Sequence, residues 1–166
     1  MQFVSTRGGS DPVSFFDAFA NGLAPDGGLY VPKNLPLLPS DLLIEDALPY
    51  PALAWDILGL FDSDHNPDHL VEIVDKSYGD FSDTMSAPLT QLEDNLFVLE
   101  LFHGPTLSFK DFGLQLIGNL FEEQIERTGQ TINVLGATSG DTGSAAIHGL
   151  AGKKGVNAFV LYLSLI

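Results

Sequence analysis

Strand-like and helix-like runs alternate in TINVLGATSGDTGSAAIHGLAGKKGVNAFVL, residues 131–161. The apolar runs at 131–135 and 156–161 predict two short strands, and residues 142–151 predict a helix between them. A strand, a helix and a second strand at this spacing are typical of a βαβ unit in a parallel sheet. Ligand sites in such sheets lie at the C-terminal ends of the strands, where the glycine-rich loop 136–143 begins.

The same alternation continues toward the N-terminus. Residues 96–101 predict another strand, and residues 109–127 predict a helix whose apolar side chains have helical spacing. We therefore expect residues 91–166 to form the first βαβαβ part of an α/β domain, with a parallel sheet covered by helices on both faces.

The sequence before residue 90 has a different texture. Nine of the ten prolines lie there, the apolar runs are short, and only Pro105 follows. We expect residues 1–90 to form a small, mainly helical N-terminal lobe. Its predicted elements are a helix from a cap at Ser10 or Asp11 to about Asn21, a turn at 24–28, a strand at 29–31 and helices at 50–61 and 66–78.

The composition excludes several classes of protein. Seven basic residues stand against 22 acidic ones, and no lysine or arginine cluster could follow a phosphate backbone, so nucleic acid is not an expected partner. The absence of cysteine excludes disulfides, thiolate metal sites and thiol catalysis. The N-terminus lacks a signal-peptide pattern, and no run approaches the roughly 20 apolar residues that span a bilayer. We expect a cytoplasmic protein with no membrane partner.

Lys110 is electrostatically unusual at the head of its predicted helix. The first turn of a helix carries partial positive charge, which disfavours a cation. Phe109, Phe112 and the helix terminus are expected to push the ammonium toward its neutral, nucleophilic form, and the chemistry this suggests is imine formation. The alternative is a helix capped by Ser108 and Asp111, in which Lys110 points into water.

The loop Gly136–Gly143 joins a predicted strand to a predicted helix that begins with small residues. Successive N–H groups at such a junction form a concave set of donors that suits a carboxylate or a phosphate. The alternative is a connection whose glycines are needed only for positive φ. The loop lacks the lysine of a P-loop and the spacing of a dinucleotide fingerprint, so neither ATP nor NAD is expected.

Together the two loops resemble those of the pyridoxal-phosphate enzymes of the tryptophan-synthase-β fold type, known as fold type II, and within them the threonine synthase family. Pro105–Gly113 matches the family's lysine-bearing segment throughout, and Ala137–Gly143 matches its second segment, including an aspartate typical of one branch. Segments 5–8, 22–32 and 100–105 also look like that branch. The resemblance runs from residue 5 to about residue 162.

The resemblance implies a cofactor, a substrate and roles for individual residues. Lys110 would bind pyridoxal 5′-phosphate as an imine and then act as the catalytic base, and Asp141 would lie near the cofactor's 3′-oxygen. The reaction implied is the conversion of O-phosphohomoserine and water to threonine and phosphate. The residues implied to bind the substrate's carboxylate are Thr138, Ser139, Gly140 and Thr142.

A complete member of this family is more than twice as long as this chain. The resemblance therefore implies an incomplete fold-type-II domain, lacking the loop for the cofactor's phosphate, and we expect the 166 residues alone to be inactive. After residue 162 the sequence also departs from the family, which usually continues with proline and a basic stretch. Two alternatives stay open: another lyase of this fold, such as a serine or threonine dehydratase or a cysteine synthase, or a non-catalytic fragment that serves as an interaction module. The oligomeric state is not predicted.

Three weaker signals lie outside these loops. His65 and His69 have helical spacing beside several aspartates, but Pro67 interrupts them, so we expect a solvated acidic loop and no metal. His103 either touches substrate or cofactor, or fixes its turn through a backbone hydrogen bond. Arg7 either approaches a phosphate or is an ordinary surface arginine.

Overall fold

A computed structural model of the chain describes residues 1–40, 42, 48–62, 67–138 and 140–162. Helices and strands are mixed along the chain, and the sheets are small. In chain order the elements are β1 (Phe3–Ser5), α1 (Phe15–Asn21), β2 (Tyr30–Pro32), α2 (Tyr50–Phe61), α3 (Pro67–Tyr78), β3 (Leu89–Glu93), β4 (Leu96–Leu99), α4 (Asp111–Thr128), β5 (Ile132–Ala137), α5 (Asp141–Leu150) and β6 (Val156–Leu161). Among the described residues, no helix is both long enough and apolar enough to cross a membrane.

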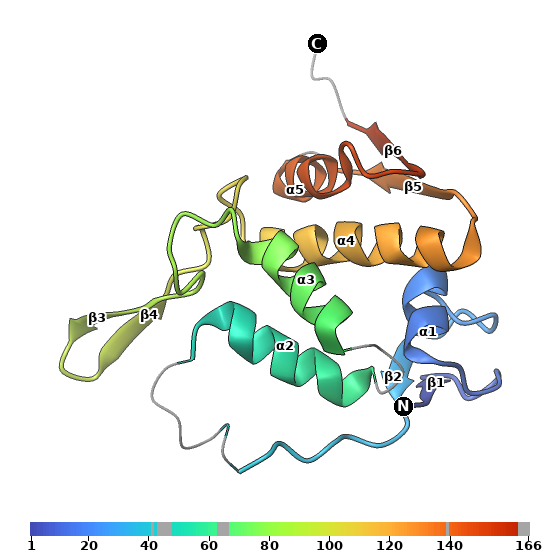
Figure 1. The fold of residues 1–166 in the computed structure, drawn as a ribbon, viewed down its shortest axis with the longest axis horizontal. Helices are drawn as coiled ribbons and strands as arrows, with labels where there is room; N and C mark the ends of the chain where they lie inside the picture. Colours follow the sequence, from blue (N-terminus) through green and yellow to red (C-terminus); the bar gives the residue numbers. More distant parts are fainter. Residues whose placement is uncertain (41, 43–47, 63–66, 139, 163–166) are drawn as a thin grey trace.

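Helices α2, α3 and α4 follow one another in one layer of packed helices (Figure 1). Aromatic side chains form the core between them. The rings of Tyr50 and Phe81 lie edge-on to Phe112, with centroids 4.8 and 5.0 Å away. The Tyr78 hydroxyl donates a hydrogen bond to the Phe112 carbonyl at 3.0 Å. Phe112 lies two residues after Lys110, so the packing of the earlier helices fixes the start of α4. The helices predicted at 50–61 and 66–78 are confirmed, the second beginning at Pro67.

The prediction for residues 96–101 was wrong in its pairing. β4 forms an antiparallel hairpin with β3, with Leu89 opposite Leu99, and does not join the parallel sheet. The cause is the short Asp94-Asn95 connection, because a tight turn of this kind returns the chain beside itself, whereas parallel strands need a long crossover. The hairpin projects from the helical part of the molecule (Figure 1).

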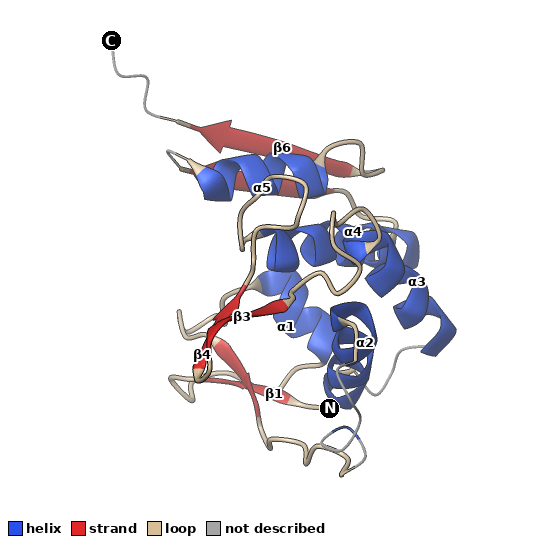
Figure 2. Cartoon of the chain, turned by 90° about the vertical axis from the view of Figure 1, so that its left-hand side faces the viewer, coloured by secondary structure: helices blue, strands red, loops and turns tan. Residues whose placement is uncertain are grey.

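The parallel pair predicted after α4 is confirmed. β5 and β6 run parallel from Ile132 opposite Val156 to Ala137 opposite Leu161. Helix α5 packs against β6 and against α4, and Figure 2 shows it lying alongside β6. Leu135, Phe159 and Leu161 of this pair are 56 to 73% exposed. These side chains occupy alternate positions, so they share one open face of the pair.

The N-terminal lobe differs from its prediction at one cap. Ser14, not Ser10 or Asp11, caps α1 by accepting a hydrogen bond from the Asp17 amide at 3.1 Å. The chain before it is extended because Val13 exchanges two backbone hydrogen bonds with Phe3. The predicted turn is confirmed by the bond from the Ala24 amide to the Gly28 carbonyl, although the following strand is displaced to Tyr30–Pro32.

Candidate functional site

A buried carboxylate holds the loop that carries Lys110. Asp111 is 0% exposed, and its side chain accepts hydrogen bonds at 2.8 Å from both the amide and the hydroxyl of Thr106. A third donor, the Gln115 side-chain amide one turn further along α4, lies 3.2 Å from Asp111 Oδ1. Because these donors come from Thr106 in the loop and from Gln115 in the helix, Asp111 ties the loop to the helix.

The predicted helix cap by Ser108 and Asp111 is wrong, because no described side chain makes a capping hydrogen bond to α4, and the segment instead forms a tight turn before the helix. The Asp111 amide donates to the Ser108 carbonyl at 2.9 Å, and the Lys110 amide donates to the Ser108 hydroxyl at 3.3 Å. Lys110 occupies the cap position, and α4 begins at the next residue. Leu107 has a positive φ of 59°, an unfavourable conformation for a residue with a branched side chain. The backbone immediately before the lysine is therefore strained.

Close packing also fixes the entrance to this loop. A Cβ atom added at Gly104 would lie 2.5 Å from the Asp111 side chain, far inside van der Waals contact. Only glycine fits there without movement of the buried carboxylate.

The amine of Lys110 reaches toward the glycine-rich loop. Its Nζ atom lies 3.5 Å from Asp141 Oδ2 and 4.3 Å from the centroid of the Phe109 ring. Both neighbours attract an ammonium, so the Phe109 ring does more than shield the amine from water. The Lys110 side chain is 27% exposed, which leaves the nitrogen accessible to a small molecule. The two loops singled out in the sequence therefore meet at their charged residues.

The glycine-rich loop is open at the positions named from the sequence. Gly140 and Thr142 are exposed and Thr138 is half-buried, while Ser139 lies outside the described residues. The Thr138 amide donates to the Leu161 carbonyl at 2.9 Å, and its methyl group occupies the space that a side chain at Gly143 would need. The glycines of this loop do not have positive φ, so that explanation for them is wrong.

The start of α5 provides donors for an anion. The first N–H groups of a helix have no partner within it, and they carry partial positive charge. No atom lies within 4 Å of a Cβ position built at Gly136 or Gly140, so a ligand could approach the backbone closely there. Lys110 and Asp141 stand at the edge of this opening, where they could hold a cofactor that reacts with an amine.

The ring of His103 contacts two side chains, and neither contact is the backbone hydrogen bond that one sequence interpretation proposed. Its Nε2 atom lies 2.7 Å from Glu100 Oε2, and its Nδ1 atom lies 3.3 Å from the Ser82 hydroxyl. The hydrogen bond from His103, with a second from Thr90, holds the pKa of the Glu100 carboxyl below its usual value. This cluster ties the end of the hairpin to the segment that leads into the Lys110 loop.

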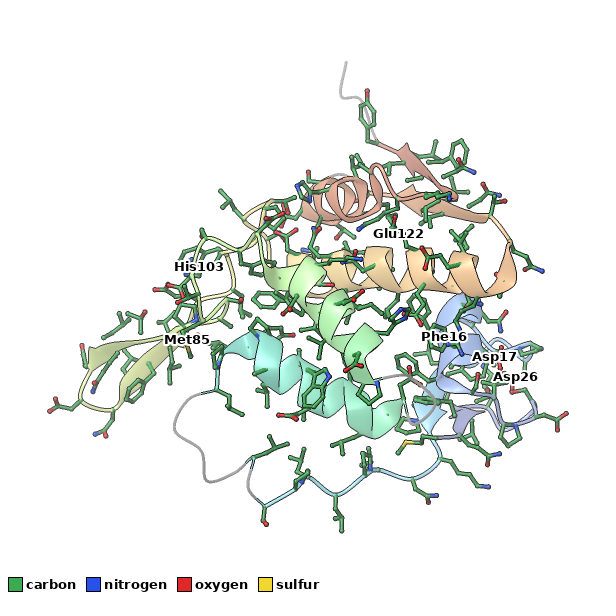
Figure 3. All side chains as sticks on the ribbon, in the orientation of Figure 1. Phe16, Asp17, Asp26, Met85, His103 and Glu122 are labelled. Atoms are coloured by element: carbon green, nitrogen blue, oxygen red, sulfur yellow. The ribbon has the colours of Figure 1, made fainter. Side chains whose placement is uncertain are left out.

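Arg7 lies in the N-terminal lobe. Its guanidinium donates to the Asp26 carbonyl at 3.1 Å, while the Asp26 carboxylate accepts from the Ser5 hydroxyl and from backbone amides of the same lobe. The Ser5 hydrogen bond is the main cause of the lowered pKa of Asp26. Figure 3 shows Asp26 and His103 on opposite sides of the molecule. The hydrogen bond of Arg7 therefore lies within the N-terminal lobe, and it is not made to the Lys110 loop.

A metal site is not formed by the described residues. His69 lies 3.7 Å from Glu123, while His65 lies outside the described residues. Within the described part of the chain, no group of three or more possible ligands could hold a metal ion.

Sequence reasoning did not identify Gln115, which contacts both Asp111 and His148. The available signal was its spacing, four residues after Asp111 on the same face of the helix.

Comparison with sequences of known proteins finds one family along the chain. A family described as "Threonine synthase N terminus" matches residues 2–78. The threonine synthase of Schizosaccharomyces pombe is 44% identical over 98% of this chain and 34% of its own length. That of Pseudomonas aeruginosa is also 44% identical, over 98% of this chain and 35% of its own length. The chain thus spans about a third of the length of these curated relatives.

Solved structures give the same correspondence. A crystal structure of PLP-bound threonine synthase from Brucella melitensis has a TM-score of 0.93 and 38% identity, covering 98% of this chain and 35% of that chain. The crystal structure of threonine synthase from yeast has a TM-score of 0.92 and 42% identity, with the same coverage.

Proposed function

This chain corresponds to the N-terminal region of the threonine synthase family, and we propose that it contributes the lysine-bearing wall of a pyridoxal 5′-phosphate-dependent lyase. The proposed reaction converts O-phosphohomoserine and water to threonine and phosphate. The observation that carries the proposal is the 3.5 Å approach of Lys110 Nζ to Asp141 Oδ2, which joins the two loops that resemble the family. In this proposal the chain forms the start of a fold-type-II domain.

The residues at this junction fit the cofactor. Pyridoxal phosphate carries an aldehyde that reacts with a primary amine, and the partly exposed Lys110 provides that amine. Asp141 provides an acceptor beside it for the cofactor's 3′-oxygen, and the open backbone at Gly136 and Gly140 leaves room for a flat ring. When bound, the cofactor supplies a conjugated system that stabilises negative charge on the substrate.

Lys110 would also move protons. In its neutral form, the Lys110 amine would be the base that removes the proton from the substrate's α-carbon and later returns it. The Phe109 ring and the anchored turn on the other side of Lys110 restrict where the amine can lie. Holding the amine over one carbon lowers the entropic cost of each transfer.

The loop before α5 would hold the substrate's carboxylate. The exposed residue Thr142 offers an N–H group and a hydroxyl group at a helix N-terminus, and the exposed Gly140 leaves the approach to them open. Thr138 adds a hydroxyl that already accepts a hydrogen bond from the Gly140 amide at 3.4 Å. We propose the same role for Ser139. Fixing this carboxylate orients the α-carbon toward Lys110.

We also propose that residues 1–166 alone do not turn over substrate, because they correspond to only about a third of the length of the relatives. The division into a lobe of residues 1–90 and a domain of residues 91–166 belongs to the same proposal. We propose that the lobe holds the lysine-bearing helix in place. Side chains of α2 and α3 pack against the start of α4, which is consistent with this role.

The test uses the full-length protein that contains this sequence. Borohydride reduction of the protein with its cofactor should fix the cofactor to a lysine, and peptide mass spectrometry should locate it at Lys110. The Lys110→Ala variant should lose this linkage and at least about 1,000-fold of phosphate release from O-phosphohomoserine. Lys76→Ala, which changes an exposed lysine on α3, is the matched control and should retain both.

The same assays separate the alternatives. Formation of an α-keto acid without release of phosphate would replace the proposed reaction with that of a dehydratase. Linkage of the cofactor to another lysine would move the catalytic role away from Lys110. Failure of the full-length protein to bind any cofactor would favour a non-catalytic interaction module.

A further inference from the structure

One face of α4 is polar where a helix face usually packs with apolar side chains. Asp111, Gln115, Asn119 and Glu123 follow one another at intervals of four residues and are 0, 8, 5 and 9% exposed. Burial of polar groups is unfavourable unless they form hydrogen bonds. The contacts of this stripe therefore indicate what it does.

Gln115 joins two helices through one side-chain amide. Its nitrogen lies 3.2 Å from Asp111 Oδ1, and its oxygen lies 3.2 Å from Nδ1 of His148 on α5. A carboxylate only accepts hydrogen bonds, so the amide nitrogen must face Asp111 and the amide oxygen must face His148. The His148 ring must then carry its hydrogen on Nδ1. The buried carboxylate thus sets the direction of both bonds.

The two ends of this bridge lead to the two loops of the site. Asp111 directly follows Lys110 and holds the Thr106 amide and hydroxyl. His148 lies on α5, the helix that begins at Asp141. The bridge is therefore a direct side-chain connection between the lysine loop and the helix that carries its partner carboxylate.

Helices α4 and α5 also touch directly through their backbones, beside the Gln115–His148 hydrogen bond. Side chains at Gly118 and Gly149 would collide with the Gly149 and Leu114 carbonyls, respectively. Helices that touch through their backbones cannot slide without a clash, so a hydrogen bond between them has a defined geometry. On α4 this fixed contact spans Leu114 to Gly118, so Gln115 lies within it.

We propose that Gln115 is a positioning residue for the reaction proposed above, linking Asp111 to His148 so that Lys110 and Asp141 keep a fixed separation. This inference rests on the proposed function for its catalytic consequence but not for its structural one. Loss of either end of the bridge uncouples the lysine loop from α5. Misplacement of a catalytic group by about 1 Å can cost about 100-fold in rate, so a partial loss of coupling should be measurable.

The first test is a double-mutant cycle in the full-length enzyme. Gln115→Leu and His148→Leu should each lower kcat about tenfold and change KM less than about twofold, because they alter placement of the amine and not substrate binding. The double variant should lose no more than Gln115→Leu alone, since either change already breaks the connection. Gln124→Leu, on the same helix, is the control for a glutamine-to-leucine change. Additive losses in the double variant would overturn the proposal.

The second test needs neither cofactor nor activity. In Gln115→Leu and in His148→Leu, hydrogen exchange should become faster at the Thr106 amide, which Asp111 holds. The Phe81 amide, which donates to the Tyr78 carbonyl within the aromatic core, should exchange at an unchanged rate. Equal acceleration at both amides would show a general loss of stability and would overturn the positioning role.

His148→Leu keeps the inference testable if Gln115→Leu fails to fold, because His148 is exposed. Unchanged exchange at Thr106 and unchanged kcat in that variant would refute the bridge. These outcomes differ from failure of the proposed function, which is seen as retention of the cofactor linkage in Lys110→Ala whatever the exchange pattern.

Discussion

The two walls of the candidate site are built in opposite ways. The Lys110 loop is anchored from inside, by the fully buried Asp111 and by the ring of Phe112 against the aromatic core. The glycine-rich loop is exposed at Gly140 and Asp141 and keeps open space above its backbone. The wall that holds the reacting amine is thus preorganised within this chain, whereas the wall proposed to bind the anion is left accessible to its ligand.

The difference also separates stability from binding. Buried polar groups lower stability strongly when they lose their partners, whereas exposed ones have water as an alternative. Substitutions in the Lys110 loop should therefore change folding, and matched substitutions in the glycine-rich loop should not. The difference can be measured by comparing a position in or beside the Lys110 loop with a matched position elsewhere in the chain.

The largest effect is expected from the two aspartates. Asp111→Ala removes the acceptor of three donors, two on the half-buried Thr106 and one on the buried Gln115, which should lower the free energy of unfolding by about 3 kcal/mol. Asp141→Ala changes an exposed carboxylate and should cost less than about 0.5 kcal/mol. Urea unfolding followed by circular dichroism measures both. Equal losses would mean that the two walls do not differ as described.

A smaller effect is expected from two glycines. Gly104→Ala places a Cβ atom 2.5 Å from the Asp111 side chain, so the loop or the carboxylate must move, at a cost of about 1 to 3 kcal/mol. Gly140→Ala meets no atom within 4 Å, and its φ of −169° is accessible to alanine, so it should change stability by less than about 0.5 kcal/mol. Thermal unfolding of the two variants under one buffer makes the comparison.

Gly140→Ala also tests binding in the accessible wall. In the full-length enzyme its added methyl group should raise KM for O-phosphohomoserine, because it narrows the approach to the donors at the start of α5. An unchanged KM would place the substrate's carboxylate elsewhere.

Much of this arrangement follows from local sequence. The glycine-rich loop and the position of Lys110 at the start of a helix are set by residues close together in the chain, so their pattern predicts them. The β3–β4 hairpin was missed because Leu96–Leu99 has the apolar content of a buried strand. Its partner strand β3 ends at Glu93, so only two residues connect the two strands. In that case the turn, and not the composition of the strand, decides the pairing.

Contacts between distant residues are not visible in such patterns. Gln115 and His148 are 33 residues apart, and nothing in either segment indicates that they meet. The cap of α1 was misplaced for the same reason, because the pairing of Val13 with Phe3 holds the preceding residues in an extended conformation. Long-range pairing overrides local propensity in both cases.

The smallest expected effect concerns Glu100, whose ionisable side chain lies beside the segment that leads into the Lys110 loop. Hydrogen bonds from His103 and Thr90 lower the pKa of Glu100 in the folded protein. A carboxyl with a lowered folded-state pKa adds stability above its unfolded pKa, and this contribution is lost as the pH falls through the folded value. Glu100→Gln should therefore destabilise the protein slightly at pH 7, and its difference from the original protein should shrink below the ordinary glutamate value of 4.5.

Urea unfolding at pH 7 and at about pH 4 measures this difference, with Glu126→Gln as the control for removing one exposed negative charge at the far end of α4. A Glu100→Gln effect that stays constant between the two pH values would show that the carboxylate's charge does not support the loop. The neutral hydrogen bonds of the glutamine would then suffice, and the internal anchoring of the Lys110 wall would depend on Asp111 and the aromatic core alone.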